Sequence, residues 1–202
     1  MTLVDSITVK RLGRVEYLAT WTAMRDFTAT RDEDTPDELW LLEHPAVYTL
    51  GQASEHPPLA NGIPLVKTDR GGHITYHGPG QLVVYTLVDL ARRGVGVKAF
   101  VRALEQAVID FVGSRAERRP GAPGVYVDGA KLAALGIRVR QGRAYHGLSL
   151  NVDMDLSPFA AIDPCGYPGL AVTQLRELAI PGTVDAVGEK LAGILAKRIE
   201  DA

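Results

Sequence analysis

The sequence predicts an α+β fold, a mixed β-sheet flanked by helices, from three features. Apolar side chains recur every three or four positions over 97–112, which predicts a helix packed on a sheet. The continuous apolar run 81–87 is typical of a strand covered on both faces. Residues 136–140 and 145–152 flank the short turn 141–143, which predicts an antiparallel hairpin. Hairpins and helices in one chain indicate a mixed sheet.

The elements before the central strand follow from local patterns. Residues 7–12 alternate apolar and polar side chains, as a half-buried strand does. A helix follows and ends before Pro36, because apolar side chains recur at helical spacing at Tyr17, Leu18, Trp21 and Met24. Residues 38–42 and 46–50 are predicted as two further strands.

The remaining elements are shorter, except for the last helix. Residues 53–64, rich in proline and glycine, predict a surface loop, and 65–68 predict a short strand. Residues 114–124 gather arginines and prolines and are predicted as a loop before a strand at 125–127. The last helix is expected to begin after Thr183, a good N-cap residue.

Length and composition narrow the class of protein. A chain of 202 residues with 46% hydrophobic side chains fits one globular domain spanning residues 1–202. Lys and Arg number 22 against 24 Asp and Glu, so a nucleic-acid partner is not expected. Apolar runs such as 82–88 are too short to cross a membrane, and the start has no secretory-signal pattern. The single cysteine, Cys165, excludes an intrachain disulfide, and a cytoplasmic location is expected.

Residues 70–81 read RGGHITYHGPGQ, the densest cluster of glycine, histidine and polar side chains in the chain. Glycine lets backbone amides approach a ligand closely, so the cluster predicts a binding loop. A structural turn whose histidines cap carbonyl groups is the alternative. Neither the phosphate-binding P-loop spacing nor the dinucleotide-binding glycine pattern is present, so the segment does not indicate a nucleotide site.

Cys165 lies in the segment DPCGYPG, whose prolines and glycines disfavour regular structure. A cysteine on such a loop can face a cleft and act as a nucleophile, whereas a buried cysteine is inert packing. A thiol needs a partner that stabilises the thiolate. Lys131, between a turn and an apolar stretch, is the first candidate, with His77 and His146 as alternatives and a solvated lysine as the plain reading. No papain-type motif and no metal-ligand spacing of histidines is present.

Together these segments resemble one family. RGGHITYHGPGQ followed by LVVY at 82–85 is similar to the signature of the octanoyltransferases, and the resemblance continues through GAKLAALG at 129–136, HGLSLNV at 146–152 and DPCG at 163–166. The order of the segments is also that of the family, so the resemblance covers essentially the whole chain. It implies the fold of biotin and lipoate protein ligase catalytic domains, which agrees with the α+β prediction.

The resemblance implies an acyl transfer without cofactor, metal ion or ATP. The donor is octanoyl-acyl carrier protein. The acceptor is a lysine of lipoyl domains, found in the E2 subunits of 2-oxoacid dehydrogenases and in the H protein of glycine cleavage. Carried onto this sequence, Cys165 holds the acyl group as a thioester and Lys131 is its acid/base partner. His77 is expected to orient this pair or the substrate carbonyl.

The resemblance also implies which segments line the acyl site. They are Arg70, Gly71, Gly72, His73, Ile74, Thr75, Tyr76 and His77 in the first segment, Ala134, Leu135 and Gly136 in the second, and Gly147, Leu148 and Ser149 in the third. Because acyl carrier protein and lipoyl domains are acidic, a docking patch is expected among Arg92, Arg93, Arg118, Arg119, Arg138 and Arg140.

Three other functions compete with this one. An ATP-dependent lipoate or biotin protein ligase of the same fold would activate a free acid and would not need Cys165. An amidotransferase of related fold would use a cysteine but take its acyl group from another carrier domain. A carrier-binding module without catalysis would tolerate Cys165→Ser.

Overall fold

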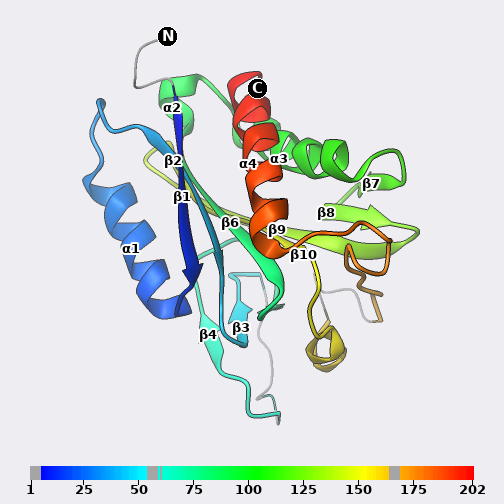
Figure 1. The fold of residues 1–202 in the computed structure, drawn as a ribbon. Helices are drawn as coiled ribbons and strands as arrows, with labels where there is room; N and C mark the ends of the chain where they lie inside the picture. The colour runs from blue at the N-terminus through cyan, green and yellow to red at the C-terminus, as the bar shows by residue number, and fades with distance from the viewer. Residues whose placement is uncertain (1–5, 54–58, 60, 164–168) are drawn as a thin grey trace.

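The computed structural model describes residues 6–53, 59, 61–163 and 169–202 (Figure 1). In these ranges a seven-stranded sheet has the order β1 (Ile7–Arg14), β2 (Asp37–Glu43), β6 (Gln81–Asp89), β10 (Arg143–Asn151), β9 (Ala130–Arg140), β8 (Ala122–Val127) and β7 (Ala116–Arg119). Strands β1 and β2 are parallel, and the other neighbours are antiparallel. The sheet is therefore mixed, and the predicted α+β fold is confirmed.

A smaller sheet and the helices complete the described part of the chain. The small sheet has the order β4 (Leu65–Lys67), β3 (Val47–Leu50) and β5 (Thr75–His77). The helices are α1 (Tyr17–Thr30), α2 (Leu90–Arg93), α3 (Val97–Val112), α4 (Val184–Glu200) and the 3₁₀ helix η1 (Ser157–Ala161). No helix within the described ranges is both long enough and apolar enough to span a membrane.

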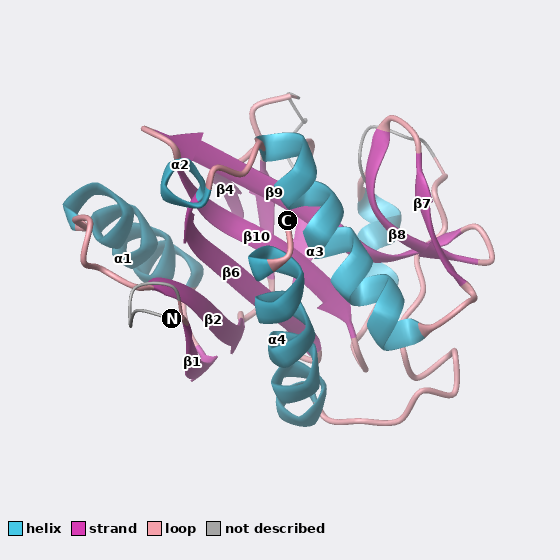
Figure 2. Cartoon of the chain, turned by 90° about the horizontal axis from the view of Figure 1, so that it is seen from above, coloured by secondary structure: helices cyan, strands magenta, loops and turns pink. Residues whose placement is uncertain are grey.

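The large sheet lies between two helical layers. Helices α3 and α4 cover one face and α1 covers the other (Figures 1 and 2). Along β2, Leu39 and Leu41 point to the α3 and α4 side, while Trp40 and Leu42 point to the α1 side. Both faces of the strand are buried, which explains why the strands β2 and β6 are apolar without alternation.

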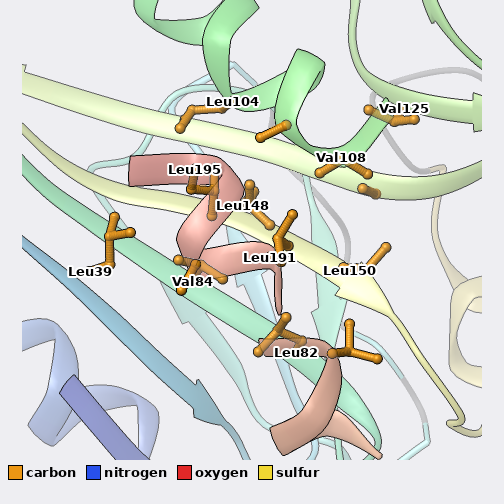
Figure 3. Close-up of a cluster of buried hydrophobic side chains, with 14 of the residues drawn as sticks. Leu39, Leu82, Val84, Leu104, Val108, Val125, Leu148, Leu150, Leu191 and Leu195 are labelled. Atoms are coloured by element: carbon orange, nitrogen blue, oxygen red, sulfur yellow. The ribbon is translucent and has the colours of Figure 1, made fainter. Parts of the chain in front are cut away.

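The largest hydrophobic core lies under α3 and α4. Figure 3 shows Leu104 and Val108 of α3 and Leu191 and Leu195 of α4 above side chains of the sheet. A second cluster around Met24 and Trp40 fills the α1 side. A third cluster, which includes Tyr48, Tyr76 and Phe159, joins the small sheet to η1. The two sheets thus have separate cores, with their junction free to form a cleft.

Most predicted elements are confirmed. Helix α3 has the predicted bounds 97–112, and the turn at 141–142 joins β9 to β10 as an antiparallel hairpin. The Thr183 side chain accepts a hydrogen bond from the Ala186 amide, as an N-cap residue does. The predicted strands at 7–12, 38–42, 46–50, 65–68 and 81–87 correspond to β1, β2, β3, β4 and β6 within a few residues at their ends.

The predicted loop at 114–124 is wrong, because most of it forms β7 and the start of β8. Its prolines and arginines suit an edge hairpin. Pro120 lies outside both strands, Pro123 lies where the β7–β8 register shifts, and Gly121 makes the turn at φ 78°. The sheet edge therefore tolerates residues that are typical of loops.

The docking patch predicted among six arginines stays a prediction, but Arg92 and Arg93 have a structural role. Their guanidinium groups lie 2.8 and 2.5 Å from the carboxylate of Asp37, which is completely buried in β2, and Arg31 lies 2.6 Å from it. These arginines compensate a buried charge, and Arg92 and Arg93 hold α2 against the start of β2.

Candidate active site

The junction of the two sheets contains a cleft of about 740 Å³ including its open mouth. On one side it is lined by residues of 70–77, and on the other mainly by residues of β9 and β10. Its lining includes Arg70, Gly72, His73, Ile74, Thr75, His77, Lys131, Ala134, Leu135, Gly136, Gly147, Leu148 and Ser149. Three segments that are far apart in the sequence therefore meet at one cavity, while Gly71 and Tyr76 lie outside its lining.

The slot between β9 and β10 is made by small residues. Gly136 pairs with Gly147, and Ala134 pairs with Ser149 two rungs further along. Leu148 and Leu150 point to the core under α3 and α4, so Ser149 faces the opposite side, toward the cleft. A Cβ atom on Gly147 would lie 2.1 Å from the Val84 carbonyl oxygen of β6, so this glycine allows the close approach of the two strands. These small residues leave a channel along the sheet.

Lys131 owes its direction to a β-bulge in β9. The neighbours Val125 and Tyr126 of β8 pair with Ala133 and Lys131, so Leu132 is an extra residue. Leu132 and Ala133 both enter the core under α3 and α4, and Lys131 consequently turns to the cleft. Without the bulge the Lys131 ammonium would share the face of Ala133 in the apolar core.

Lys131 is almost completely buried, with 3% of the residue exposed, and two contacts fix its side chain. Its Nζ donates a hydrogen bond of 3.0 Å to the carbonyl oxygen of Pro123 and lies 5.3 Å from the centre of the Tyr126 ring. Gly124 leaves the space for this side chain, since it has no Cβ. The prediction of a partly buried lysine is therefore confirmed, and the solvated alternative is wrong.

The segment that follows Cys165 in the chain is attached to Lys131. The Lys131 amide donates to the Ala171 carbonyl at 2.8 Å, and the Thr173 amide donates to the Lys131 carbonyl at 3.0 Å, which makes a parallel bridge with Val172. Cys165 itself lies outside the described residues. Its sequence distance to Ala171 is six positions.

Arg70 fixes the first segment. Its guanidinium donates to the carbonyl and hydroxyl oxygens of Thr49 in β3 and to the Gly71 carbonyl, at 2.6 to 3.2 Å. The backbone passes so close to β3 that a Cβ atom on Gly51 would lie 2.1 Å from the Gly72 carbonyl oxygen. Glycine is therefore required at Gly51 for close approach.

His77 is buried beside the cleft and is neutral. Burial, together with the nearby His44, lowers the pKa of His77 to about 3. Its Nδ1 donates to the Gln81 side-chain oxygen at 2.7 Å, because the Gln81 amide nitrogen already donates to Asn151. The Asn151 amide in turn donates to the Thr173 carbonyl, so His77 is linked to the segment bridged to Lys131.

Sequence reasoning missed His44 and Tyr85, which lie next to His77. His44 Nδ1 donates to the Val15 carbonyl at 2.6 Å, so its Nε2 carries a lone pair that accepts the Tyr85 hydroxyl at 2.7 Å. Burial lowers the pKa of His44 to about 4, which keeps it neutral. Tyr17 lines the cleft beside them, and burial raises its pKa to about 12.

Asp69 was also missed, although it directly precedes the glycine-rich cluster. Its carboxylate accepts hydrogen bonds from Trp21, Tyr145 and His146 at 2.9, 2.5 and 2.9 Å. Burial acts to raise the pKa of Asp69, but these three donors outweigh it and hold the pKa well below its usual range. His146, at φ 62°, is thereby fixed in the cleft wall with its proton on Nε2. No sequence pattern marks a carboxylate whose three donors come from α1 and β10.

Three further arginines of the predicted docking patch have contacts within the chain. Arg118 pairs with Glu105 of α3, and Arg119 lies over the Tyr126 ring. Arg138 donates to the Gln52 side chain. Within the described ranges, no group of three or more His, Cys, Asp or Glu side chains could hold a metal ion.

Comparison with known proteins gives the class first and the family second. The fold is that of lipoate and biotin protein ligases. A bipartite lipoate protein ligase from Thermoplasma acidophilum has a TM-score of 0.74 at 15% identity over 96% of this chain and 84% of its own. A biotin protein ligase from Aquifex aeolicus has a TM-score of 0.58 at 8% identity, over 96% of this chain and 71% of its own. At these identities the similarity shows the fold.

The chain belongs to the family of the lipoyl protein ligase A/B catalytic domain, whose model matches residues 16–196. Two relatives are much more similar than the ligase structures. A protein of Dechloromonas aromatica (strain RCB) is 59% identical, over 95% of this chain and 96% of its own length. A protein of Pseudomonas putida (strain KT2440) is 54% identical over 96% and 92%. Both carry the name octanoyltransferase.

Proposed function

We propose that this chain transfers an octanoyl group from the thiol of acyl carrier protein to one lysine of a lipoyl domain, with Cys165 as the intermediate carrier. The full-length relatives named octanoyltransferase make the chain an acyltransferase. The donor, the acceptor lysine and the cysteine thioester are the further content of this proposal. It treats residues 1–202 as one catalytic domain.

The observation that carries the proposal is the placement of Lys131. A β-bulge turns its amine away from the core into an apolar cleft, and the backbone of Lys131 is bonded to the segment that follows Cys165. A buried ammonium stabilises a nearby thiolate and, once it loses its proton, serves as a base. An inert structural lysine would need neither the bulge nor the space at Gly124.

The first step is exchange between two thioesters. The Cys165 thiolate attacks the carbonyl carbon of the donor, a bond to Sγ forms, and the bond to the phosphopantetheine sulfur breaks. The leaving thiolate takes a proton from the Lys131 ammonium. The two thioesters are similar in energy, so this step needs no ATP.

The second step forms the amide. The amine of the acceptor lysine attacks the acyl-enzyme carbonyl, neutral Lys131 takes up the proton, and the bond to Sγ breaks. Lys131 and Cys165 thereby return to their starting protonation states. Aminolysis of a thioester is favourable, so the second step also needs no ATP.

The slot formed by Ala134, Gly136, Gly147 and Ser149 has the chemistry of an acyl-chain site. Small residues at these two pairs, which are separated by one rung, allow an alkyl chain to lie against the sheet, and the residues of 70–77 form the facing wall. The apolar surface that an eight-carbon chain buries favours binding.

His77 has a positioning role in this account. A neutral imidazole whose Nδ1 proton is used for Gln81 does not act as a general base on that side. Through Gln81 and Asn151 it instead supports the segment 171–173 beside Lys131. His77 therefore orients the Cys165 and Lys131 pair, with no direct proton transfer.

The proposed partners follow from this reaction. The donor is octanoyl-acyl carrier protein, and the acceptors are lipoyl domains of the E2 subunits of 2-oxoacid dehydrogenases and the H protein of glycine cleavage. Both meet the enzyme in the cytoplasm, where the thiol of Cys165 stays reduced.

The test compares donors. Purified chain is mixed with a lipoyl domain and either octanoyl-acyl carrier protein alone or octanoate with ATP, and octanoylation of the domain is measured by mass. We expect product only with the thioester donor, and loss of product in Cys165→Ser and Lys131→Ala. Product only with octanoate and ATP would identify a ligase, and product from an octanoylated carrier domain but not from acyl carrier protein would identify an amidotransferase.

A further inference from the structure

Glu105 lies on α3, in the layer that covers the opposite face of the sheet from the cleft, and belongs to none of the motifs singled out in the sequence. Only 6% of the residue is exposed. Its Oε1 accepts a hydrogen bond of 3.0 Å from the Gly124 amide. An acidic side chain at such a position is costly to bury unless it has hydrogen bonds and a counter-charge.

One peptide group joins Glu105 to Lys131. The amide that Glu105 binds belongs to Gly124, and the carbonyl of the same peptide belongs to Pro123. That carbonyl accepts the hydrogen bond from Lys131 Nζ, also at 3.0 Å. A negative charge at the N–H end of a peptide aligns with its dipole and makes the carbonyl oxygen a better acceptor.

The local sequence explains why this peptide needs support. Gly124 has φ 143°, a conformation that glycine adopts readily, and the β7–β8 pairing shifts register beside it. The sheet ladder alone therefore does not fix the direction of the Pro123 carbonyl. Glu105 supplies the missing constraint from the helix above.

We infer that Glu105 is a positioning residue for Lys131: it fixes the Pro123–Gly124 peptide so that the carbonyl of this peptide holds the Lys131 amine in the cleft. The inference rests on the proposed role of Lys131 in transfer. It adds a buried carboxylate, reached through the sheet, to the residues that determine the reaction.

Other charged groups surround this arrangement. Arg118 of β7 lies 3.1 Å from the second oxygen of Glu105 and reduces its net field at Lys131. Arg119 of β7 lies 4.5 Å over the Tyr126 ring that also contacts Lys131. Arg70, His77 and His146 line the same cleft. Glu105 Oε1 contacts the shared peptide directly through the Gly124 amide, so removal of the carboxylate releases the peptide whose carbonyl holds Lys131.

The experiment compares Glu105→Gln, which keeps an acceptor for the Gly124 amide, with Glu105→Met, which removes it. Asp110→Asn is the matched control, because it removes an acidic group from the same helix that is paired with Arg198 and not with the sheet. Trace labelling with acetic anhydride at one fixed pH, quantified on the Lys131 peptide by mass spectrometry, reports directly how firmly the amine is held. Octanoyl transfer from acyl carrier protein to a lipoyl domain is measured in parallel, with melting temperatures.

We expect Lys131 to be labelled at least about three-fold faster in Glu105→Met, where its amine is no longer held, and at the rate of the unsubstituted chain in Glu105→Gln and Asp110→Asn. Transfer at its optimum pH is expected to fall about ten-fold in Glu105→Met, the loss of one hydrogen bond to a charged group, and to be largely restored in Glu105→Gln. These two results together support the inference.

An unchanged labelling rate of Lys131 in Glu105→Met would overturn it, and so would a changed labelling rate with full transfer in that variant. A loss of transfer in both variants without a change in the labelling rate would show general damage to the fold and would also overturn it. Failure of the proposed function is distinguishable, because the unsubstituted chain would then not octanoylate the lipoyl domain from octanoyl-acyl carrier protein, while the labelling experiment would still report on Glu105.

Discussion

A Cβ atom on Gly124 would lie 2.6 Å from Cε of Lys131 and 3.1 Å from its Nζ. The space for the Lys131 side chain is therefore provided by the absence of a side chain on the neighbouring strand. The same Cβ atom would also lie 2.7 Å from the Ala133 carbonyl oxygen, which is backbone and cannot move aside easily. Gly124 and Lys131 thus form a complementary pair across β8 and β9.

Gly124→Ala is predicted to lower octanoyl transfer about a hundred-fold, because the amine is displaced from its position in the cleft. Gly121→Ala is the control. Gly121 also has positive φ, at 78°, but a Cβ atom there meets nothing within 4 Å. We expect Gly121→Ala to cost about 1 kcal/mol of stability with little change in rate. Transfer rates and urea unfolding of both variants check this, and equal rates in the two would contradict it.

Ala134→Leu is predicted to shorten the acyl chain that the slot accepts. The leucine side chain would fill the part of the cleft that lies over the Ala134–Ser149 pair. We expect the rate with octanoyl donor to fall at least about ten-fold relative to the rate with butanoyl donor, the scale of discrimination for added methylene groups. Ala99→Leu, on the exposed side of α3, should leave the ratio unchanged. If the ratio of the octanoyl rate to the butanoyl rate is the same in Ala134→Leu, Ala99→Leu and the unsubstituted chain, the acyl chain lies elsewhere.

Stability is predicted to fall as the pH drops from about 6.5 toward 4, partly through His44. Its pKa is about 4 in the folded chain, lowered by burial from an ordinary 6.5, so the unfolded chain binds the proton first. The contribution is fully present above 6.5 and amounts to roughly 3 kcal/mol, lost as the pH approaches 4. His44→Gln retains a donor for Val15 and an acceptor for Tyr85 but does not titrate. Its unfolding free energy should decline less than that of the unsubstituted chain between pH 7 and pH 4.5, and parallel curves would refute the assignment.

Asp37→Asn is predicted to cost about 3 to 5 kcal/mol at pH 7, because three guanidinium groups lose a buried counter-charge. Burial acts to raise the pKa of Asp37, but the Asp89 amide and the arginines outweigh it, so the pKa is lowered. The stabilisation is therefore present above the ordinary value near 3.9 and is lost as the pH falls below it. The difference between the two proteins in urea unfolding should shrink in acid. Asp201→Asn, which removes the exposed pair with Lys197, should change stability by less than about 0.5 kcal/mol.

The sequence was sufficient to predict the elements whose stability is local or whose burial is uniform. The 97–112 helix repeats its apolar positions at helical spacing, and β6 is apolar along its length because both faces are covered. Both patterns arise from one or two layers that pack directly on the element. The edge strand β7 and the start of β8 could not be found in this way, because Arg118 pairs with a side chain of α3 and the prolines fall at a turn and a register shift.

Some residues of the candidate site could likewise be predicted from the sequence, and others could not. The glycine-rich segment and Lys131 stand out as anomalies in the sequence, and the structure brings them to one cleft. Asp69, His44 and Glu105 act through partners that are distant in the sequence. Asp69 and His146, for example, are 77 positions apart. The bulge at Leu132 leaves no mark in the sequence, since KLAAL is also compatible with a regular strand. Such features depend on tertiary pairing and become visible only in the folded chain.

The measurement that tests the central claim most directly is mass spectrometry of the intact chain after mixing with octanoyl-acyl carrier protein in the absence of ATP. The account predicts an added octanoyl group that is released by hydroxylamine, maps to the peptide containing Cys165, and disappears when a lipoyl domain is added. Cys165→Ser should show no such group. An unmodified chain that nevertheless octanoylates the lipoyl domain, or an octanoyl group on a residue other than Cys165, would contradict the account.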